Sequence, residues 1–210
     1  MTSAVASGRP SRIVSDQISP RLLKAGVQLF LRHGYEKTSM DAVAAKAGIS
    51  KRTLYSRFPS KAGLFEAVVN SVLERSMRSF KESPAALTTF PSALRAFATN
   101  LLDAMLVADV VALERVVIGE AAQFPDLAAR LHARFKDYIV DLLADLIMHF
   151  EPEARRARAD VHRDAELFLA MVALPPLRRA VLFQSKPGLA DEDRQAIDRA
   201  VEIFVKGARS

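Results

Sequence analysis

The spacing of apolar residues is the feature of this sequence that most constrains its fold. From about residue 19 onward, apolar residues recur every three or four positions, and no segment alternates apolar and polar residues. The first pattern places apolar side chains on one face of a helix, whereas alternation is typical of a half-buried strand. The 210 residues suffice for a hydrophobic core in one large or two small domains. We therefore predict an all-α fold with about nine helices.

Capping and helix-breaking residues give the boundaries of these helices. In the first part of the chain, helices are expected to start at Ser19, Thr38, Ser50 and Ser60 and to end at Gly34, Gly48 and Pro59. The helix that starts at Ser60 is expected to continue past Phe80 and to break at Ser83-Pro84. Further helices are expected at 87–105, 110–121, 125–150, 160–183 and 191–206. We expect the helix at 160–183 to bend at Pro175-Pro176, because a proline nitrogen cannot donate the helical hydrogen bond.

Composition divides the chain into three parts. Residues 1–18 are small and polar and contain Gly and Pro, so we expect a disordered arm. Residues 19–64 are expected to form a three-helix head, and residues 65–210 a larger helical bundle. Residues 1–61 contain eleven Lys or Arg and three Asp or Glu, a net charge of +8, whereas the remaining 149 residues are slightly acidic. This asymmetry predicts a module that binds a polyanion, attached to a second domain.

Several classes of function are excluded by what the sequence lacks. Without cysteine, the chain has no disulfide framework, no thiol nucleophile and no cysteine-ligated zinc. The four histidines do not pair at metal-ligand spacing, and neither a Gly-rich phosphate loop nor a nucleophile elbow is present. The N-terminus has no signal-peptide core, and the longest apolar run, 167–177, is shorter than the roughly 18 residues that a membrane span needs. We expect a cytoplasmic protein that is not an enzyme and carries no cofactor or metal.

Residues 34–65 contain the most specific motifs. The chain reads Thr38-Ser39, then Ala44-Ala45-x-Ala47-Gly48-Ile49-Ser50, then Thr53-Leu54-Tyr55-x-x-Phe58-x-Ser60-Lys61-x-x-Leu64. Over about residues 18–65 this sequence resembles the TetR family of bacterial transcription regulators. A second string, Gly119-Glu120-x-x-x-Phe124-Pro125-x-Leu127, is similar to the AefR-like subgroup. The resemblance implies a helix-turn-helix domain followed by a helical domain for ligand binding and dimerisation.

The helix at 50–58 is the expected reader of DNA. Lys51, Arg52 and Thr53 lie in its first turn, which reaches base edges when such a helix enters the major groove, and Ser56 lies one turn further on the same face. The matching family positions assign phosphate contacts to Tyr55 and Arg57. Ser39 and Lys61, at the starts of neighbouring helices, are expected to add phosphate contacts. The complete set of expected DNA-binding residues is Ser39, Ser50, Lys51, Arg52, Thr53, Tyr55, Ser56, Arg57 and Lys61. Leu54 and Phe58 are expected to point inward, and a solvated basic face is the alternative for the cations.

Dimerisation and ligand binding follow from the resemblance. It implies that the helices at 160–183 and 191–206 pair with those of a second copy in a four-helix bundle, and that a small-molecule ligand lies within helices four to eight. Apolar candidates for the dimer interface are Phe168, Met171, Val172, Leu182 and Phe183. Candidates for the ligand site are Phe97, Leu101, Met105, Phe124, Phe135 and Phe168. For both sets, burial in the core of one protomer remains the alternative.

These expectations combine into one function. The sequence predicts a ligand-responsive DNA-binding transcriptional regulator, a repressor that binds a palindromic operator on double-stranded DNA as a homodimer. The alternative is a helical protein that coats nucleic acid without sequence preference and has no sensor. Footprinting separates the two classes, because a regulator protects a discrete site and a coating protein protects DNA uniformly.

Overall fold

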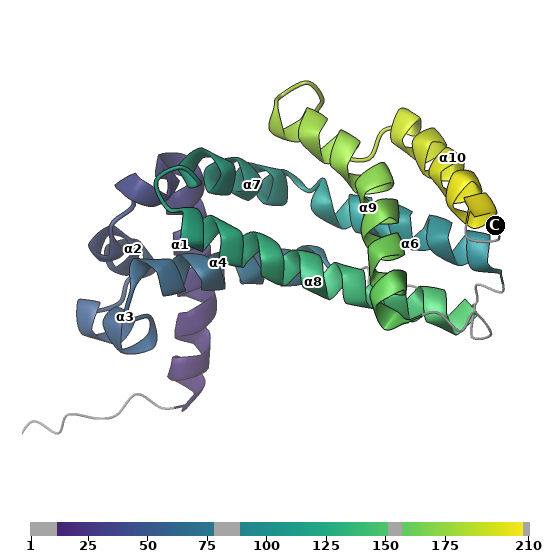
Figure 1. Cartoon of the computed structure of the whole chain (residues 1–210). Coiled ribbons are helices and arrows are strands. Elements are labelled where there is room, and N and C mark those ends of the chain that lie inside the picture. The colour runs from purple at the N-terminus through teal and green to yellow at the C-terminus, as the bar shows by residue number, and fades with distance from the viewer. Residues whose placement is uncertain (1–11, 78–88, 151–156, 208–210) are drawn as a thin grey trace, which may run out of the picture. The chain divides into compact units, whose positions relative to one another are not determined.

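The computed structural model describes residues 12–77, 89–150 and 157–207 (Figure 1). Within these ranges the chain forms nine helices and no strand, which confirms the predicted all-α class. The helices are α1 Arg12–Lys37, α2 Met40–Ala47, α3 Lys51–Arg57, α4 Lys61–Ser76, α6 Phe90–Met105, α7 Ala108–Glu120, α8 Pro125–Phe150, α9 Arg158–Val181 and α10 Asp191–Gly207. None of the helices in the described ranges is both long enough and apolar enough to span a bilayer.

The chain divides into two compact units, Met1–Val69 and Asn70–Ser210. The expected boundary lay at residues 64–65, and the observed division falls a little later, inside α4. α4 therefore starts in the first unit and ends in the second. The expected continuation of this helix through Phe80 and its break at Ser83-Pro84 lie outside the described residues.

The start of α1 differs from the prediction. The helix begins at Arg12 and not at Ser19, and Pro20 lies inside it. Inside a helix, proline removes one hydrogen bond and its ring crowds the carbonyl four residues earlier, but its backbone φ is helical, and α1 continues through Pro20. Residues 12–18 of the expected arm are thus helical, whereas residues 1–11 lie outside the described part. At the other end, Gly34 has φ 78° and ψ 177°, which interrupts the helix where the sequence predicted its end.

The first unit packs around three aromatic side chains. The Phe65 ring lies 4.8 Å from the Phe30 ring in an edge-on arrangement and 5.1 Å from the Tyr35 ring. Leu22, Val43, Leu54 and Leu64 are fully enclosed around them. α1 and α4 approach closely at Gly26, where an added Cβ would lie 2.6 Å from Cγ2 of Val68. These contacts bring α1, α2, α3 and the first part of α4 into a single small core.

The N-cap of α2 is Ser39, which corrects the prediction of Thr38. The Ser39 side chain accepts a hydrogen bond from the Ala42 amide at 3.1 Å. Thr38 is buried, and its hydroxyl donates to the carbonyl oxygens of Gly34 at 2.7 Å and Leu29 at 3.2 Å. Both residue types cap helices well. The carbonyls left open at the end of α1 bind the Thr38 hydroxyl, so Ser39 takes the cap position.

α9 is the central helix of the second unit, because it contacts α6, α7, α8 and α10. Its Phe168 ring is fully buried and meets the Phe204 ring of α10 edge-on at 5.1 Å. The ribbon of α9 changes direction along its length in Figure 1, as expected for a helix that contains Pro175 and Pro176. The remaining helices supply the core residues Leu94, Leu101 and Leu102 of α6, Val111 of α7, Leu143 and Ile147 of α8, and Ile197 and Val201 of α10.

Polar contacts hold both ends of α9 in place. At its C-terminus, Arg115 of α7 donates to the carbonyl oxygens of Ala180 at 2.5 Å and Val181 at 2.9 Å. The same guanidinium lies 3.5 Å from the ring centre of Phe183, whose φ of 59° ends the helix. Near its N-terminus, ion pairs to α8 connect Arg158 with Asp145 at 3.1 Å and Glu166 with Lys136 at 2.9 Å. α9 is therefore attached to two neighbouring helices by charged groups as well as by its core.

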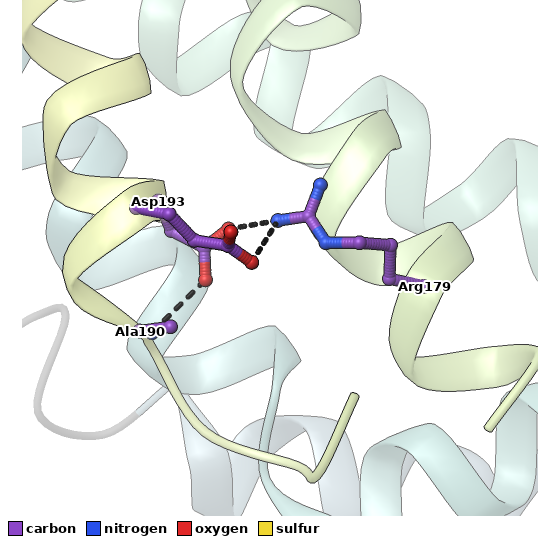
Figure 2. A network of polar contacts seen from close by, with 4 residues as sticks. Arg179, Ala190 and Asp193 are labelled. Carbon is purple, nitrogen blue, oxygen red and sulfur yellow. Dashed lines mark hydrogen bonds and ion pairs between the residues drawn. The ribbon is translucent and has the colours of Figure 1, made fainter. Parts of the chain in front are cut away.

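The link from α9 to α10 is organised by a buried carboxylate. Asp193 is only 5% exposed, and Figure 2 shows it between Arg179 of α9 and the backbone of Ala190. Its carboxylate accepts hydrogen bonds from the Arg179 guanidinium and, at 2.9 Å, from the Ala190 amide. The second contact satisfies an amide at the start of α10, in the manner of a capping box. Asp193 thus joins the end of one helix to the start of the next.

Candidate nucleic-acid interface

The turn between α2 and α3 depends on two residues that the sequence identified. Gly48 has φ 67° and ψ 36°, and its amide bonds back to α2, so it closes that helix in a left-handed conformation. Ser50 then caps α3 by accepting a hydrogen bond from the Thr53 amide at 3.1 Å. These local contacts turn the chain sharply and set the direction in which α3 leaves.

One face of α3 is anchored and the opposite face is exposed. Leu54 is fully buried and Phe58 is half-buried, so the expectation that both point inward is met in full only by Leu54. Lys51, Arg52, Tyr55 and Ser56 are exposed, and Thr53 and Arg57 are half-buried. The helix therefore presents cations and hydroxyl groups to solvent, while its apolar contact fixes its rotation.

Lys51 is engaged with a residue that the sequence analysis did not place in the site. Its ammonium donates to Oδ2 of Asp41, in α2, at 2.5 Å. This hydrogen bond, reinforced by the negative charge of Asp41, raises the pKa of Lys51 above its ordinary value. In the sequence, the only sign of this contact was that Asp41 and Lys51 lie ten residues apart on either side of a tight turn.

Arg52 has a different environment from Lys51. Among the described residues it has no hydrogen-bond or ion-pair partner, and it is exposed. The hydroxyls near it are satisfied locally, since Ser50 Oγ and Thr53 Oγ1 lie 2.8 Å apart and Ser56 donates to the Thr53 carbonyl at 2.9 Å. Arg52 is thus the expected base reader whose polar groups are available without breaking another contact.

Two expected phosphate ligands begin the flanking helices. Ser39 is exposed at the start of α2, where it serves as the N-cap. Lys61, the first residue of α4, donates to the Glu36 carbonyl at 2.9 Å and lies 4.6 Å from the ring centre of Tyr35. Lys61 thus holds α4 to the end of α1 in addition to supplying charge. Tyr55, also expected at a phosphate, is 46% exposed.

The expected ligand-site residues lie mostly in the core of the second unit. Phe97, Leu101 and Phe168 are buried there, and Met105 and Phe135 pack against the same cluster while remaining partly exposed. Phe124 is half-buried in the connection between α7 and α8. A surface pocket of about 290 Å³ is lined by Val72, Arg75, Ser76, Asn100, Asp103, Ala104 and Val107, so none of the six candidates borders it.

The expected dimer-interface residues separate into two groups. Phe168 and Val172 are buried within the protomer and cannot face a second copy without rearrangement. Met171, Leu182 and Phe183 are exposed. Two further exposed residues of α9, Leu167 and Leu174, continue the face of Met171 because they lie four residues before it and three after it. The sequence showed the spacing of these three residues. Because α9 carries apolar residues on several sides, however, the sequence did not indicate which face is exposed.

Two family models match the chain. The model described as "Bacterial regulatory proteins, tetR family" matches residues 22–68. The model described as "AefR-like transcriptional repressor, C-terminal domain" matches residues 92–207, which is more than half of the chain. The two matches cover the two parts of the sequence in which the motifs indicated these resemblances.

Known proteins of similar sequence and structure are transcriptional regulators, a class without enzymatic activity. The chain is 25% identical over 166 residues to the transcriptional activator FasR of Mycolicibacterium smegmatis, covering 79% of this chain and 72% of FasR. The flavonoid-responsive regulator FrrA is 30% identical with a TM-score of 0.71, covering 91% of this chain and 97% of FrrA. A TetR-family regulator from Mesorhizobium loti has a TM-score of 0.73 at 23% identity, covering 94% and 98% of the two chains.

Proposed function

Since the chain belongs to the TetR family of bacterial transcription regulators, with the C-terminal domain of its AefR-like repressors, we propose that it is a ligand-responsive repressor. In this proposal it binds a palindromic operator as a homodimer and is released from it by a small molecule. The observation that carries the proposal is the exposed basic face of α3, held in place by Leu54 within a segment of net charge +8.

In this proposal the site residues have two roles: some contact bases and the others contact phosphates. Arg52, Lys51, Thr53 and Ser56 read base edges in the major groove, with the guanidinium of Arg52 suited to the O6 and N7 atoms of guanine. The other members of the set hold the phosphate backbone and fix the register of α3. These are Ser39, Ser50, Tyr55, Arg57 and Lys61.

The palindromic operator follows from the need for two heads. One seven-residue helix contacts few base pairs, so specific recognition requires a second head at a spacing of about 34–36 Å or a multiple of it. The exposed stripe of Leu167, Met171 and Leu174 on α9 supports a two-fold contact, because such a contact uses the same patch on both copies. Ile203 of α10, the other helix of the proposed contact, is also an exposed apolar residue, at 48%.

The second unit is the sensor in this proposal. The description of the C-terminal family as repressors favours repression over the activating role of FasR. The flavonoid response of FrrA favours an apolar, aromatic ligand for this chain as well. Phe97, Leu101, Met105, Phe124, Phe135 and Phe168 are the proposed ligand contacts, reached when the core around them opens. Such a ligand releases DNA only by its higher affinity for the form that does not bind the operator, and operator DNA weakens ligand binding by the same factor.

A footprint on the DNA beside the gene tests the proposal. The intergenic DNA is searched for an inverted repeat, and the fragment is titrated with the purified full-length chain in gel-shift and footprinting assays. We expect a discrete protected site with two-fold symmetry. Uniform protection along the fragment would instead identify a coating protein without sequence preference.

The sensor is tested separately. Flavonoids and other aromatic compounds are screened by thermal shift, since a compound that binds only the folded state raises the melting temperature. A compound that raises it is then expected to release the protein from the operator fragment. If every compound that stabilises the chain leaves the operator complex intact, the ligand-responsive part of the proposal is wrong.

A further inference from the structure

Asp41 is the only acidic group recorded in direct contact with an expected base-reading side chain in the described part of the chain. Its carboxylate lies on α2, and the ammonium that it binds lies on the first residue of α3, so the contact bridges the turn of the helix-turn-helix. The two side chains are 52% and 67% exposed, which leaves both open to solvent and to an approaching ligand. A group that binds Lys51 from outside therefore either shares the ammonium with the carboxylate or replaces it.

We propose that Asp41 competes with DNA for Lys51 and thereby limits the affinity of the head for DNA. The inference rests on the proposed DNA contact of Lys51. The carboxylate at 2.5 Å occupies one of the three donors of the ammonium and neutralises part of its charge, so a phosphate oxygen or a guanine acceptor binds Lys51 more weakly or must displace Asp41. In both cases the carboxylate lies beside the negatively charged duplex. Both consequences oppose binding, and neither affects Arg52, which has no partner among the described residues.

Competition for Lys51 must be distinguished from a second effect of Asp41 on DNA binding. A carboxylate at a DNA-facing surface also weakens binding by simple repulsion of phosphate, whether or not it holds a lysine. Repulsion acts on the whole head, and without the ammonium of Lys51 the carboxylate is no longer neutralised, so its repulsion of DNA is at least as large as in wild type. Competition for Lys51 disappears when that ammonium is removed. A double-mutant cycle separates these two effects.

The experiment compares wild type, Asp41→Asn, Lys51→Met and the double variant as full-length proteins. Dissociation constants are measured on two fluorescent probes: a duplex of about 30 bp enriched by the wild-type protein from a random pool, and the unselected pool itself. Asp41→Asn is expected to tighten binding by about two- to fivefold per head, and by about four- to 25-fold for a dimer with two heads. In the Lys51→Met background, the same substitution is expected to change the affinity much less.

The gain in affinity from Asp41→Asn, measured with and without Lys51, decides between competition and repulsion. A gain in the Lys51→Met background that equals or exceeds the gain in wild type assigns the effect to repulsion and overturns the proposal, and so does a loss or no change of affinity in Asp41→Asn. Asparagine keeps the size of the side chain, and circular dichroism checks that the head remains folded. Asp41→Ser provides a second variant if the amide pairs with Lys51. If wild type enriches no sequence, the proposed operator binding fails, while competition for Lys51 is still measured on the unselected pool.

Discussion

Arg52 is the side chain on which base recognition is expected to depend most. It is exposed, it lies in the first turn of α3, and it has no partner among the described residues that must be given up. Replacing it with Ala is expected to cost about 1–3 kcal/mol of operator binding and to relax the preference at one or two base positions. Selection from a random pool followed by sequencing measures both effects.

A matched control for Arg52 exists on the second unit. Arg194 of α10 is also exposed and helical, so Arg194→Ala removes the same charge from the second unit. We expect this variant to keep the wild-type base preference. Equal base preferences in Arg52→Ala and wild type would rule out Arg52 as a base reader.

Glu114 of α7 makes the stability of the second unit depend on pH. Burial raises the pKa of its carboxyl above the ordinary value of 4.5, and the charge of His132 opposes this shift. Because the folded pKa exceeds the unfolded one, the contribution of Glu114 to stability is complete below pH 4.5 and is lost as the pH rises through the folded pKa. Glu114→Gln removes this loss, since glutamine does not ionise.

The prediction for Glu114→Gln is therefore a difference that grows with pH. The variant is expected to be more stable than wild type at pH 7 and to lose this advantage as the pH falls through the folded pKa of Glu114 to 4.5. Urea unfolding at a series of pH values measures it. A constant difference across the series would show that the substitution acts through packing and not through charge.

At the scale of elements, the connection between α9 and α10 depends on Asp193. Its carboxylate is buried and serves both the Arg179 guanidinium and the Ala190 amide. Replacing it with Ala leaves both donors without this acceptor, and we expect a loss of about 2–4 kcal/mol in the free energy of unfolding. Thermal unfolding followed by circular dichroism measures the change.

Asp191 serves as the control for Asp193. It lies in the same first turn of α10 and carries the same charge, but it is exposed. Asp191→Ala loses only the favourable interaction of an acid with the helix N-terminus, about 0.5 kcal/mol. If the two alanine variants are equally stable, the buried contacts of Asp193 do not stabilise the link.

At the scale of the whole molecule, dimerisation is expected to depend on the exposed stripe of α9. Leu167 is 63% exposed and Leu174 is 59% exposed in the protomer, so replacing both with Glu leaves the core intact. We expect the variant to sediment as a folded monomer and to bind a palindromic operator at least about 100-fold more weakly, because the two heads are no longer linked. Analytical ultracentrifugation and gel shift measure these quantities.

Ile118 of α7 provides the matched control for this stripe. It is 54% exposed, and Ile118→Glu adds one negative charge, half of the charge added in the double variant, to an apolar surface residue outside α9 and α10. This variant is expected to remain dimeric. If the Leu167 and Leu174 variant also remains dimeric, the two copies meet through another surface.

Local sequence patterns were sufficient for most of the helices and for the turn. The periodicity of apolar residues located α8 at 125–150 as observed, and Gly48 and Ser50 defined the turn before α3 correctly. These features depend on contacts within a few residues of the chain, such as a side-chain oxygen bonding an amide three positions later. The sequence specifies such contacts directly.

Other features were decided by contacts between one element and its neighbours. Thr38 and Ser39 are both good caps, and the carbonyls of Leu29 and Gly34 determined which one caps α2. Apolar residues occur on several sides of α9, so only packing against α6, α7, α8 and α10 buried Phe168 and Val172 and left Leu167 exposed.

The sequence by itself determined the all-α class, the family and the position of the cation-rich helix α3, because these follow from helical periodicity, local capping and a contiguous motif. The tertiary structure decided which face of α9 is available to a second copy, and that Lys51 is held by Asp41 while Arg52 is not. Both decisions depend on where neighbouring helices place their side chains, and the spacing of residues along one helix does not contain that information.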